Sequence, residues 1–291
     1  MGWRVVVVAS NAKVDYKMDY LVIRSLESTK RVHLSEIDVL MLESTAISIT
    51  AYAVVEMLKQ KIKIVFCNHV RNPCGEVMAL NGSHDSCAKV RQQIRWNGSA
   101  KQMVWTELVR EKIRGQRDVL EKYQLPQAAM LTAYIQQLEW NDATNREGHA
   151  AKVYFNALFG AGFTRTEESY VNAALNYGYS ILLSAINREI TAAGYLTTLG
   201  IFHDNTFNAY NLSCDFMEPL RPIVDDQVMQ MELLQFEREE KMRLVSILNE
   251  EVQFGGKTYY LSEALRMYCH GLFCALQSGD PEDIRLIRYE L

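Results

Sequence analysis

The hydrophobic period of this chain changes near residue 83, and that change limits the folds open to it. Upstream, short β-branched and aromatic runs separated by turn residues are typical of strands. Such runs lie at residues 3–10, 20–24, 31–34, 38–42 and 63–67. In that part only residues 48–61 show helical spacing. Downstream, apolar residues recur with the helical period, which predicts helices at residues 87–96, 100–123, 128–140, 147–159, 169–193, 225–249 and 261–278.

The turn-forming stretch 81–86, Asn-Gly-Ser-His-Asp-Ser, separates the two patterns and is the predicted linker. We therefore predict an α+β chain. A small N-terminal β-sheet domain with one helix covers residues 1–82, and a larger all-α domain covers residues 83–291. Residues 252–260 read as one hairpin, with Gly255 and Gly256 at its turn. A chain of 291 residues is long enough for two such domains.

Composition excludes several classes of protein. The 48% hydrophobic and 23% charged content is that of a folded protein. No apolar run approaches the length of about 20 residues that spans a bilayer, and the N-terminus lacks the features of a signal peptide. We expect a cytoplasmic protein without a membrane partner. The six cysteines are expected to be free thiols, and a zinc site from Cys67, His69, Cys74, His84 and Cys87 fits no usual spacing.

One segment is basic although the whole chain carries a net charge of −4. Residues 89–122 hold nine basic and four acidic residues. Arg110, Arg114 and Arg117 are spaced to share one helix face, and a row of guanidinium groups suits a phosphate backbone. The alternative is a solvated face on which these arginines pair with Glu107, Glu111 and Glu121. The spacing favours neither.

The candidate catalytic residues lie in two polar islands. The first, 145–149, contains Glu147, and the second, 200–225, contains His203, Asp215 and Glu218. Carboxylates with one imidazole suit Mg²⁺ or Mn²⁺, and an open coordination position would accept a phosphodiester oxygen. If residues 213–218 are helical, Asp215 and Glu218 share a face, although Pro219 biases Glu218 away from helical geometry. As alternatives, His203 is a hydrogen-bonded turn residue, and Glu147 a first-turn acid favoured by the helix dipole.

Four motifs resemble those of a known family. They are Asn145-Arg146-Glu147-Gly148, Asn172-Ala173-x-x-Asn176-Tyr177-Gly178-Tyr179, Gly200-x-x-His203, and Asp215-x-x-Glu218-Pro219-x-Arg221-Pro222. In this order they resemble the CRISPR-associated integrase, the subunit of the adaptation complex that inserts new spacers into CRISPR arrays. The resemblance implies that Glu147, His203 and Glu218 are metal ligands and that Asp215 is a supporting acid. Arg146 joins the predicted DNA contacts.

The resemblance also implies the reaction and the partners. A spacer 3′-OH would attack the phosphodiester at a repeat boundary, a metal-dependent transesterification in antiviral defence. Partners would be double-stranded DNA of spacer and repeat, a second copy bound through the β domain, and a second CRISPR adaptation protein in a heterohexamer. The short spacer between the domains is similar to that of integrases from type II systems. Two alternatives stay open: a catalytically idle DNA-binding scaffold of the same fold, and a metal-dependent phosphodiesterase acting on a small substrate.

Overall fold

The computed structural model describes residues 4–77, 79 and 83–289, which belong to two units. Unit 1 comprises Met1–Ser86 together with Thr191–Tyr195, and unit 2 comprises Cys87–Ile190 and Leu196–Leu291. Residues 81 and 82 lie outside the described residues. They are the first two residues of the predicted linker, and residue 82 is one side of the predicted domain boundary. No helix in the described ranges combines the length and apolarity that a membrane crossing requires.

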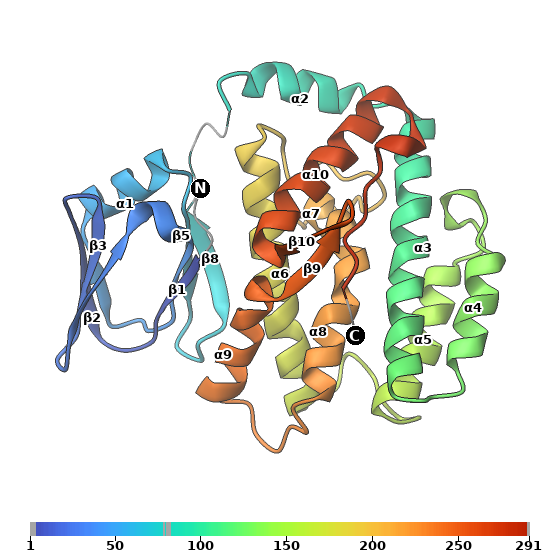
Figure 1. Ribbon diagram of the computed structural model, residues 1–291, viewed down its shortest axis with the longest axis horizontal. Helices are drawn as coiled ribbons and strands as arrows, with labels where there is room; N and C mark the ends of the chain where they lie inside the picture. The colour runs from blue at the N-terminus through green and yellow to red at the C-terminus, as the bar shows by residue number, and fades with distance from the viewer. Residues whose placement is uncertain (1–3, 78, 80–82, 290–291) are drawn as a thin grey trace. The chain divides into compact units, whose positions relative to one another are not determined.

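In its described residues, unit 1 contains two four-stranded sheets and one α-helix, α1 (Ala51–Lys59) (Figure 1). The first sheet has the order β1 (Arg4–Val8), β5 (Ile37–Leu42), β7 (Lys63–Cys67) and β8 (Pro73–Val77). The second has the order β4 (Thr29–His33), β3 (Tyr20–Arg24), β2 (Ala12–Lys17) and β6 (Ile47–Ile49). Strands β1, β5 and β7 are parallel, and β5 is buried along its whole length, as suits a sequence that is apolar at every position except Asp38. Helix α1 and both sheets share one core that includes Val14, Leu40 and Met57.

Several predictions for unit 1 need correction. The structure contains two sheets where one was expected, because β2 was missed. Its sequence alternates polar and apolar residues with three charges, which hid the strand. The predicted helix 48–61 is shorter, since Ile47–Ile49 pairs with β2 and Thr50 caps α1 at the backbone N–H of Ala53. Strand β8, which Pro73 begins, was not among the predicted strands. The strands predicted at 20–24 and 63–67 are confirmed.

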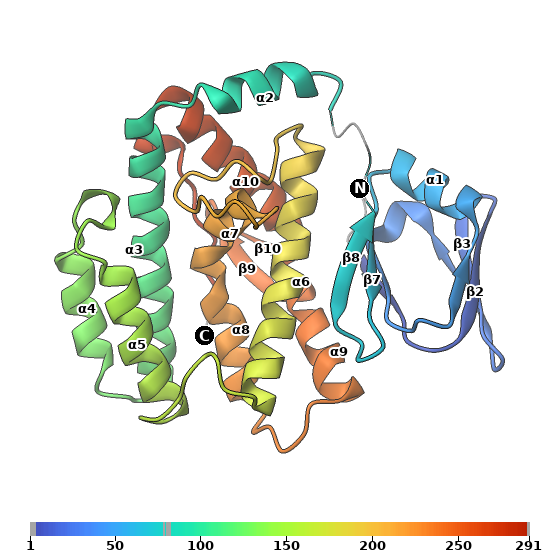
Figure 2. The ribbon, with the colours of Figure 1, turned by 180° about the vertical axis from the view of Figure 1, so that it is seen from behind.

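Unit 2 is organised around one long helix, α3 (Gly98–Lys122), which Asn97 caps. Figures 1 and 2 show the other helices around it. They are α2 (Ser86–Ile94), α4 (Ala128–Gln136), α5 (Arg146–Phe159), α6 (Tyr170–Ala192), α7 (Asn211–Met217), α8 (Arg221–Met229), α9 (Arg238–Ser246) and α10 (Leu261–Ser278). Helices α4, α5, α8 and α10 pack on α3. Its apolar positions Val109, Ile113 and Leu120 are fully buried, as the helical period predicts.

Two predictions for unit 2 are wrong. The unit is not all-α, because it contains an antiparallel pair, β9 (Glu251–Phe254) and β10 (Lys257–Tyr260). This pair is the predicted hairpin, with Gly255 and Gly256 at positive φ in its turn. The single helix predicted over 225–249 is two helices, since α8 ends at Met229 and a capping box at Glu237 starts α9.

Candidate active site

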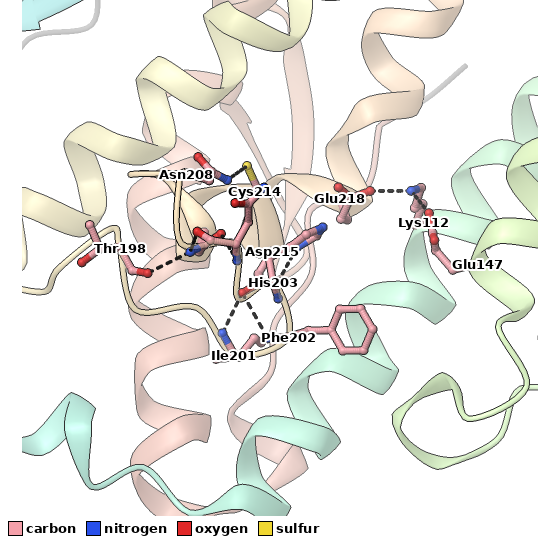
Figure 3. A network of polar contacts seen from close by, with 12 residues as sticks. Lys112, Glu147, Thr198, Ile201, Phe202, His203, Asn208, Cys214, Asp215 and Glu218 are labelled. Carbon is pink, nitrogen blue, oxygen red and sulfur yellow. Dashed lines mark hydrogen bonds and ion pairs between the residues drawn. The ribbon is translucent and has the colours of Figure 1, made fainter. Parts of the chain in front are cut away.

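Two glutamates from distant segments meet on one buried ammonium group. Lys112 Nζ, on α3, forms ion pairs with Glu147 Oε1 and with Glu218 Oε2 (Figure 3). The side chains of Lys112 and Glu218 are 8% and 5% exposed, whereas that of Glu147 is 28% exposed. The glutamates start α5 and the short 3-10 turn Glu218–Leu220. The fold therefore brings the two predicted carboxylates together, with a cation between them.

The contacts within this cluster favour the charged forms of Glu218 and Lys112. Burial alone would raise the pKa of Glu218, but Lys112 and Arg221 outweigh it and lower that pKa to about 2. Arg221 Nε donates to Glu218 Oε1 over 2.9 Å, and its guanidinium lies 4.6 Å from the centre of the Tyr179 ring. Burial would likewise lower the pKa of Lys112, but Glu218 and Glu147 raise it above its usual value. Each charge thus holds its neighbour in the charged form.

Hydrogen bonds at the first turn of α5 position Glu147. Asp142 accepts hydrogen bonds from the backbone N–H groups of Arg146 and Glu147, at 2.6 and 3.1 Å. Asn145 adopts left-handed geometry, with φ of 53°, and its side chain accepts from Gly148 N at 3.3 Å. These contacts satisfy the free donors at the helix start. A local capping arrangement therefore fixes the position of Glu147.

Asp215 holds the loop that carries His203. Its fully buried carboxylate accepts backbone hydrogen bonds from Ile201 at 2.7 Å, Phe202 at 3.3 Å and His203 at 3.0 Å. His203 Nδ1 lies 2.7 Å from Asp215 Oδ1, and because an ionised carboxylate only accepts, Nδ1 carries the proton. This bond raises the pKa of His203 above its usual value. Nε2 is the ring nitrogen left for a ligand.

The His203 loop passes so close to Asp215 that position 200 has no room for a side chain. A Cβ atom there would collide with the carbonyl oxygen of His203 and lie 2.8 Å from Asp215 Oδ2. After Asp215 the chain stays helical through Glu218, with φ of −51° and ψ of −45°, although proline follows. The expected bias of Pro219 is overridden here. Asp215 and Glu218 therefore have the helical spacing that the sequence predicted, but they bind different partners, the His203 loop and Lys112.

Glu147, His203, Glu218 and Lys112 line one cleft of about 280 Å³. Asp225 also lines it, and burial raises the pKa of that carboxyl to about 6. A larger hollow of about 770 Å³ lies elsewhere on unit 2, but no carboxylate, histidine or cysteine lines it. The smaller cleft is therefore the one equipped for acid–base or metal chemistry.

The donor set of the cleft suits a divalent metal, but the donors are not gathered around a point. Among the described residues, no three side chains of histidine, cysteine, aspartate or glutamate lie close enough to hold a metal ion. In the cleft, the ammonium group of Lys112 lies between the two carboxylates, in the position that a metal cation would take. His203, with Nδ1 on Asp215, has the arrangement usual for metal-binding histidines.

The predicted DNA-contact arginines are paired with acids. Arg110 pairs with Glu107, Arg114 with Glu111, and Arg117 with Asp118 and, at 3.6 Å, with Glu121. These side chains are 26–30% exposed. Arg146 lies 5.6 Å from the centre of the Tyr134 ring. The structure thus contains the ion-paired face that the sequence left open as the alternative.

Sequence reasoning missed the central residue of the site, Lys112. It counted the lysine only as one charge of the basic segment. Lys112 follows Trp105 by seven residues and precedes Gln116 by four, so the three share a helix face, and all three line the cleft. A lysine on a face with a buried tryptophan was the available signal. The asparagines of the second motif anchor another cleft residue, because Asn172 and Asn176 accept from Arg165 at 2.5 and 2.6 Å.

Solved structures of low sequence identity share this fold. The casposase bound to integration product superposes with a TM-score of 0.77 at 16% identity, covering 96% of this chain and 92% of the other. A CAS1 protein from Thermotoga maritima superposes with a TM-score of 0.78 at 18% identity, covering 94% and 97%. The fold is that of the casposase and Cas1 class of proteins.

Sequence comparison identifies the family within that class. The family model described as CRISPR associated protein Cas1 matches residues 5–242. The CRISPR-associated endonuclease Cas1 of Neisseria meningitidis serogroup C is 33% identical over 232 residues, which is 79% of this chain and 76% of that protein. A second relative, from Pyrobaculum aerophilum, is 27% identical over 279 residues. The chain belongs to the Cas1 family of CRISPR-associated endonucleases, and the predicted resemblance is confirmed.

Proposed function

We propose that this protein is a divalent-metal-dependent DNA integrase and endonuclease that inserts spacer DNA into a CRISPR array. The observation that carries the proposal is the convergence of Glu147 with His203 and Glu218, from two distant segments, on one cleft in which a buried cation pairs with both glutamates. Glu147, Glu218 and His203 Nε2 would hold Mg²⁺ or Mn²⁺. When bound, such an ion polarises the scissile phosphodiester and stabilises the charge that develops on the attacking and leaving oxygens.

The residues around this centre support a transesterification. A spacer 3′-oxygen would form a new bond to phosphorus while the bond to the leaving 3′-oxygen of the repeat breaks. Arg221 keeps Glu218 ionised, and Asp215 holds the His203 ring with Nε2 free. Arg165, whose guanidinium two asparagines orient, is positioned to bind phosphate oxygens in the cleft. These fixed charges would favour the crowded anionic transition state.

The partners are proposed from the relatives. One solved complex is described as Cas6-RT-Cas1–Cas2, and a chain in it superposes with a TM-score of 0.74 over 97% of this chain and 36% of that chain. We propose a heterohexamer with the Cas2-type adaptation protein, bound to spacer and repeat DNA, in a type II system. Residues 1–82 would form the homodimer contact. Exposed Met18, Leu26 and Tyr52 in this unit support an interface there.

The DNA path has two candidate tracks. Arg110, Arg114 and Arg117 would have to exchange their carboxylate partners for phosphates. Arg91 and Arg95, in the larger hollow beside the 54% exposed Trp140, form no ion pair among the described residues. Alanine variants of each arginine set, compared for duplex affinity across a salt titration, would assign the track. The set that reduces the salt slope carries the phosphate contacts.

The test of the proposed function is a strand-transfer assay with linear spacer DNA, a repeat-containing plasmid, the partner protein and Mn²⁺. Glu218→Gln and His203→Ala are each expected to lower the strand-transfer rate at least about a hundredfold. The control is Asp204→Asn, an exposed acid on the His203 loop, which should match the wild type. Wild-type rates in both site variants would refute the assignment. DNA binding without any strand transfer by the wild type would favour the idle scaffold.

A further inference from the structure

Every carboxylate oxygen that Glu218 offers is already bound by a cation of this chain. Arg221 Nε takes Oε1 at 2.9 Å, and Lys112 Nζ takes Oε2. Lys112 also takes Oε1 of Glu147. A divalent ion held between the two glutamates would therefore compete with these cations for the same carboxylates. Lys112 is the one that touches both, so its ammonium group stands where a shared metal would stand.

The charges around Lys112 explain why its ammonium group is stable between the two glutamates in the absence of metal. Two carboxylates close together, one of them buried, repel each other, and an unpaired buried charge is strongly unfavourable. One ammonium pairs with both carboxylates and compensates their charge. Its side chain is only 8% exposed, so solvent does not replace it. The same contact opposes a metal ion, because an ammonium and a divalent ion cannot occupy one position between two carboxylates.

We propose that the Lys112 ammonium group holds the two carboxylates together and competes with a divalent metal ion for them until DNA enters the cleft. The inference rests on the proposed function, since it concerns the same carboxylates. A metal ion that enters the DNA-free cleft leaves Lys112, Arg165 and Arg221 with too few anions. A phosphodiester supplies the missing anion and gives the displaced ammonium a new partner. Metal and DNA binding are thereby coupled through Lys112, each strengthening the other.

The coupling appears in metal affinity and needs no turnover. Free Mn²⁺ is measured by electron paramagnetic resonance, with and without a short DNA duplex, for the wild type, Lys112→Met and Lys112→Gln. In the DNA-free protein, both variants are expected to bind Mn²⁺ about tenfold more tightly, or better, because the competing cation is gone. The factor by which DNA raises Mn²⁺ affinity should fall in both. Lys112→Gln retains amide donors for the carboxylates, so it provides a folded variant if Lys112→Met is unstable.

The control is Lys122→Met, on the same helix, which removes an ammonium that pairs with Asp226 at 2.8 Å outside this site. It should leave Mn²⁺ affinity unchanged. Unchanged or weaker Mn²⁺ binding in the DNA-free Lys112 variants would overturn the inference, and so would an undiminished DNA effect. Failure of the proposed function is visible separately. In that case Glu218→Gln would bind Mn²⁺ as well as the wild type, with or without DNA.

Discussion

Asp215→Asn should loosen the His203 loop without changing the size of the side chain. In the native site, each carboxylate oxygen of Asp215 accepts two N–H groups, one pair from Ile201 and Phe202 and the other from the backbone and ring of His203. Asparagine has one acceptor oxygen and one donor NH₂ group. In either orientation the NH₂ group faces two donors, so two hydrogen bonds are lost.

The loss is large because the site is fully buried and the acceptor is charged. Hydrogen bonds to a charged group contribute about 1.5–3 kcal/mol each, so two of them amount to about 3–6 kcal/mol. For a unit of this size, 1 kcal/mol shifts the Tm by about 2–4 °C. The lower bound therefore predicts a Tm decrease of about 6–12 °C in metal-free protein.

Differential scanning calorimetry measures the Tm, and nitrogen NMR of the imidazole reports which ring nitrogen of His203 carries the proton. The variant should lose the preference for the Nδ1–H form. Asp204→Asn, on the same loop but exposed, is the matched control and should change neither observable. A Tm within 1–2 °C of the wild type (roughly the effect of a surface change) with the Nδ1–H form retained would refute the role assigned to Asp215.

Two further predictions concern the packing around the cleft. Burial raises the folded-state pKa of Asp225 to about 6 from a usual value of 3.8, so its contribution to stability is complete below the unfolded value and is lost as pH rises through the folded one. Between about pH 4.5 and about pH 7.5 the free energy of unfolding of the wild type, measured by urea unfolding, should fall by up to about 3 kcal/mol relative to that of Asp225→Asn. The same pH dependence of unfolding free energy in both proteins would contradict this. In Gly178→Ala the new Cβ would collide with a methyl group of Val224, so stability should fall by about 1–3 kcal/mol. The double variant with Val224→Ala should lose less stability than the sum of the losses in the two single variants. Losses that simply add would rule out the contact.

The sequence predicted the elements whose side-chain pattern is repeated along one segment. Helices α3, α5 and α10 and strands β3 and β7 were found within about two residues, because burial on one face imposes a period. Strand β2 and the break between α8 and α9 escaped the same reasoning. In β2 the charged residues Lys13 and Lys17 are exposed, so the segment looks like a solvated loop although it pairs with β3 and β6. In α8, Asp226 is buried by Lys122 and Tyr123, which are distant in the chain, so a buried charge looks like a solvated one and the segment reads as part of one long helix.

The candidate site shows the same limit. Motif order indicated Glu147, His203, Asp215 and Glu218, and the structure brings the three proposed ligands to one cleft. The pairing of Asp215 with His203 depends on the path of a loop, and the place of Lys112 depends on three helices meeting. Neither could be inferred from spacing. The row of arginines shared a face as predicted, but its spacing could not decide between phosphates and the neighbouring carboxylates.

The most direct test of the metal assignment is anomalous diffraction from crystals of the DNA-bound protein soaked in Mn²⁺. We predict one manganese peak within coordination distance of Glu147, Glu218 and His203 Nε2, with Lys112 Nζ moved away from Glu218. A cleft in which Lys112 still bridges the two glutamates, with no manganese peak between them, would contradict the assignment.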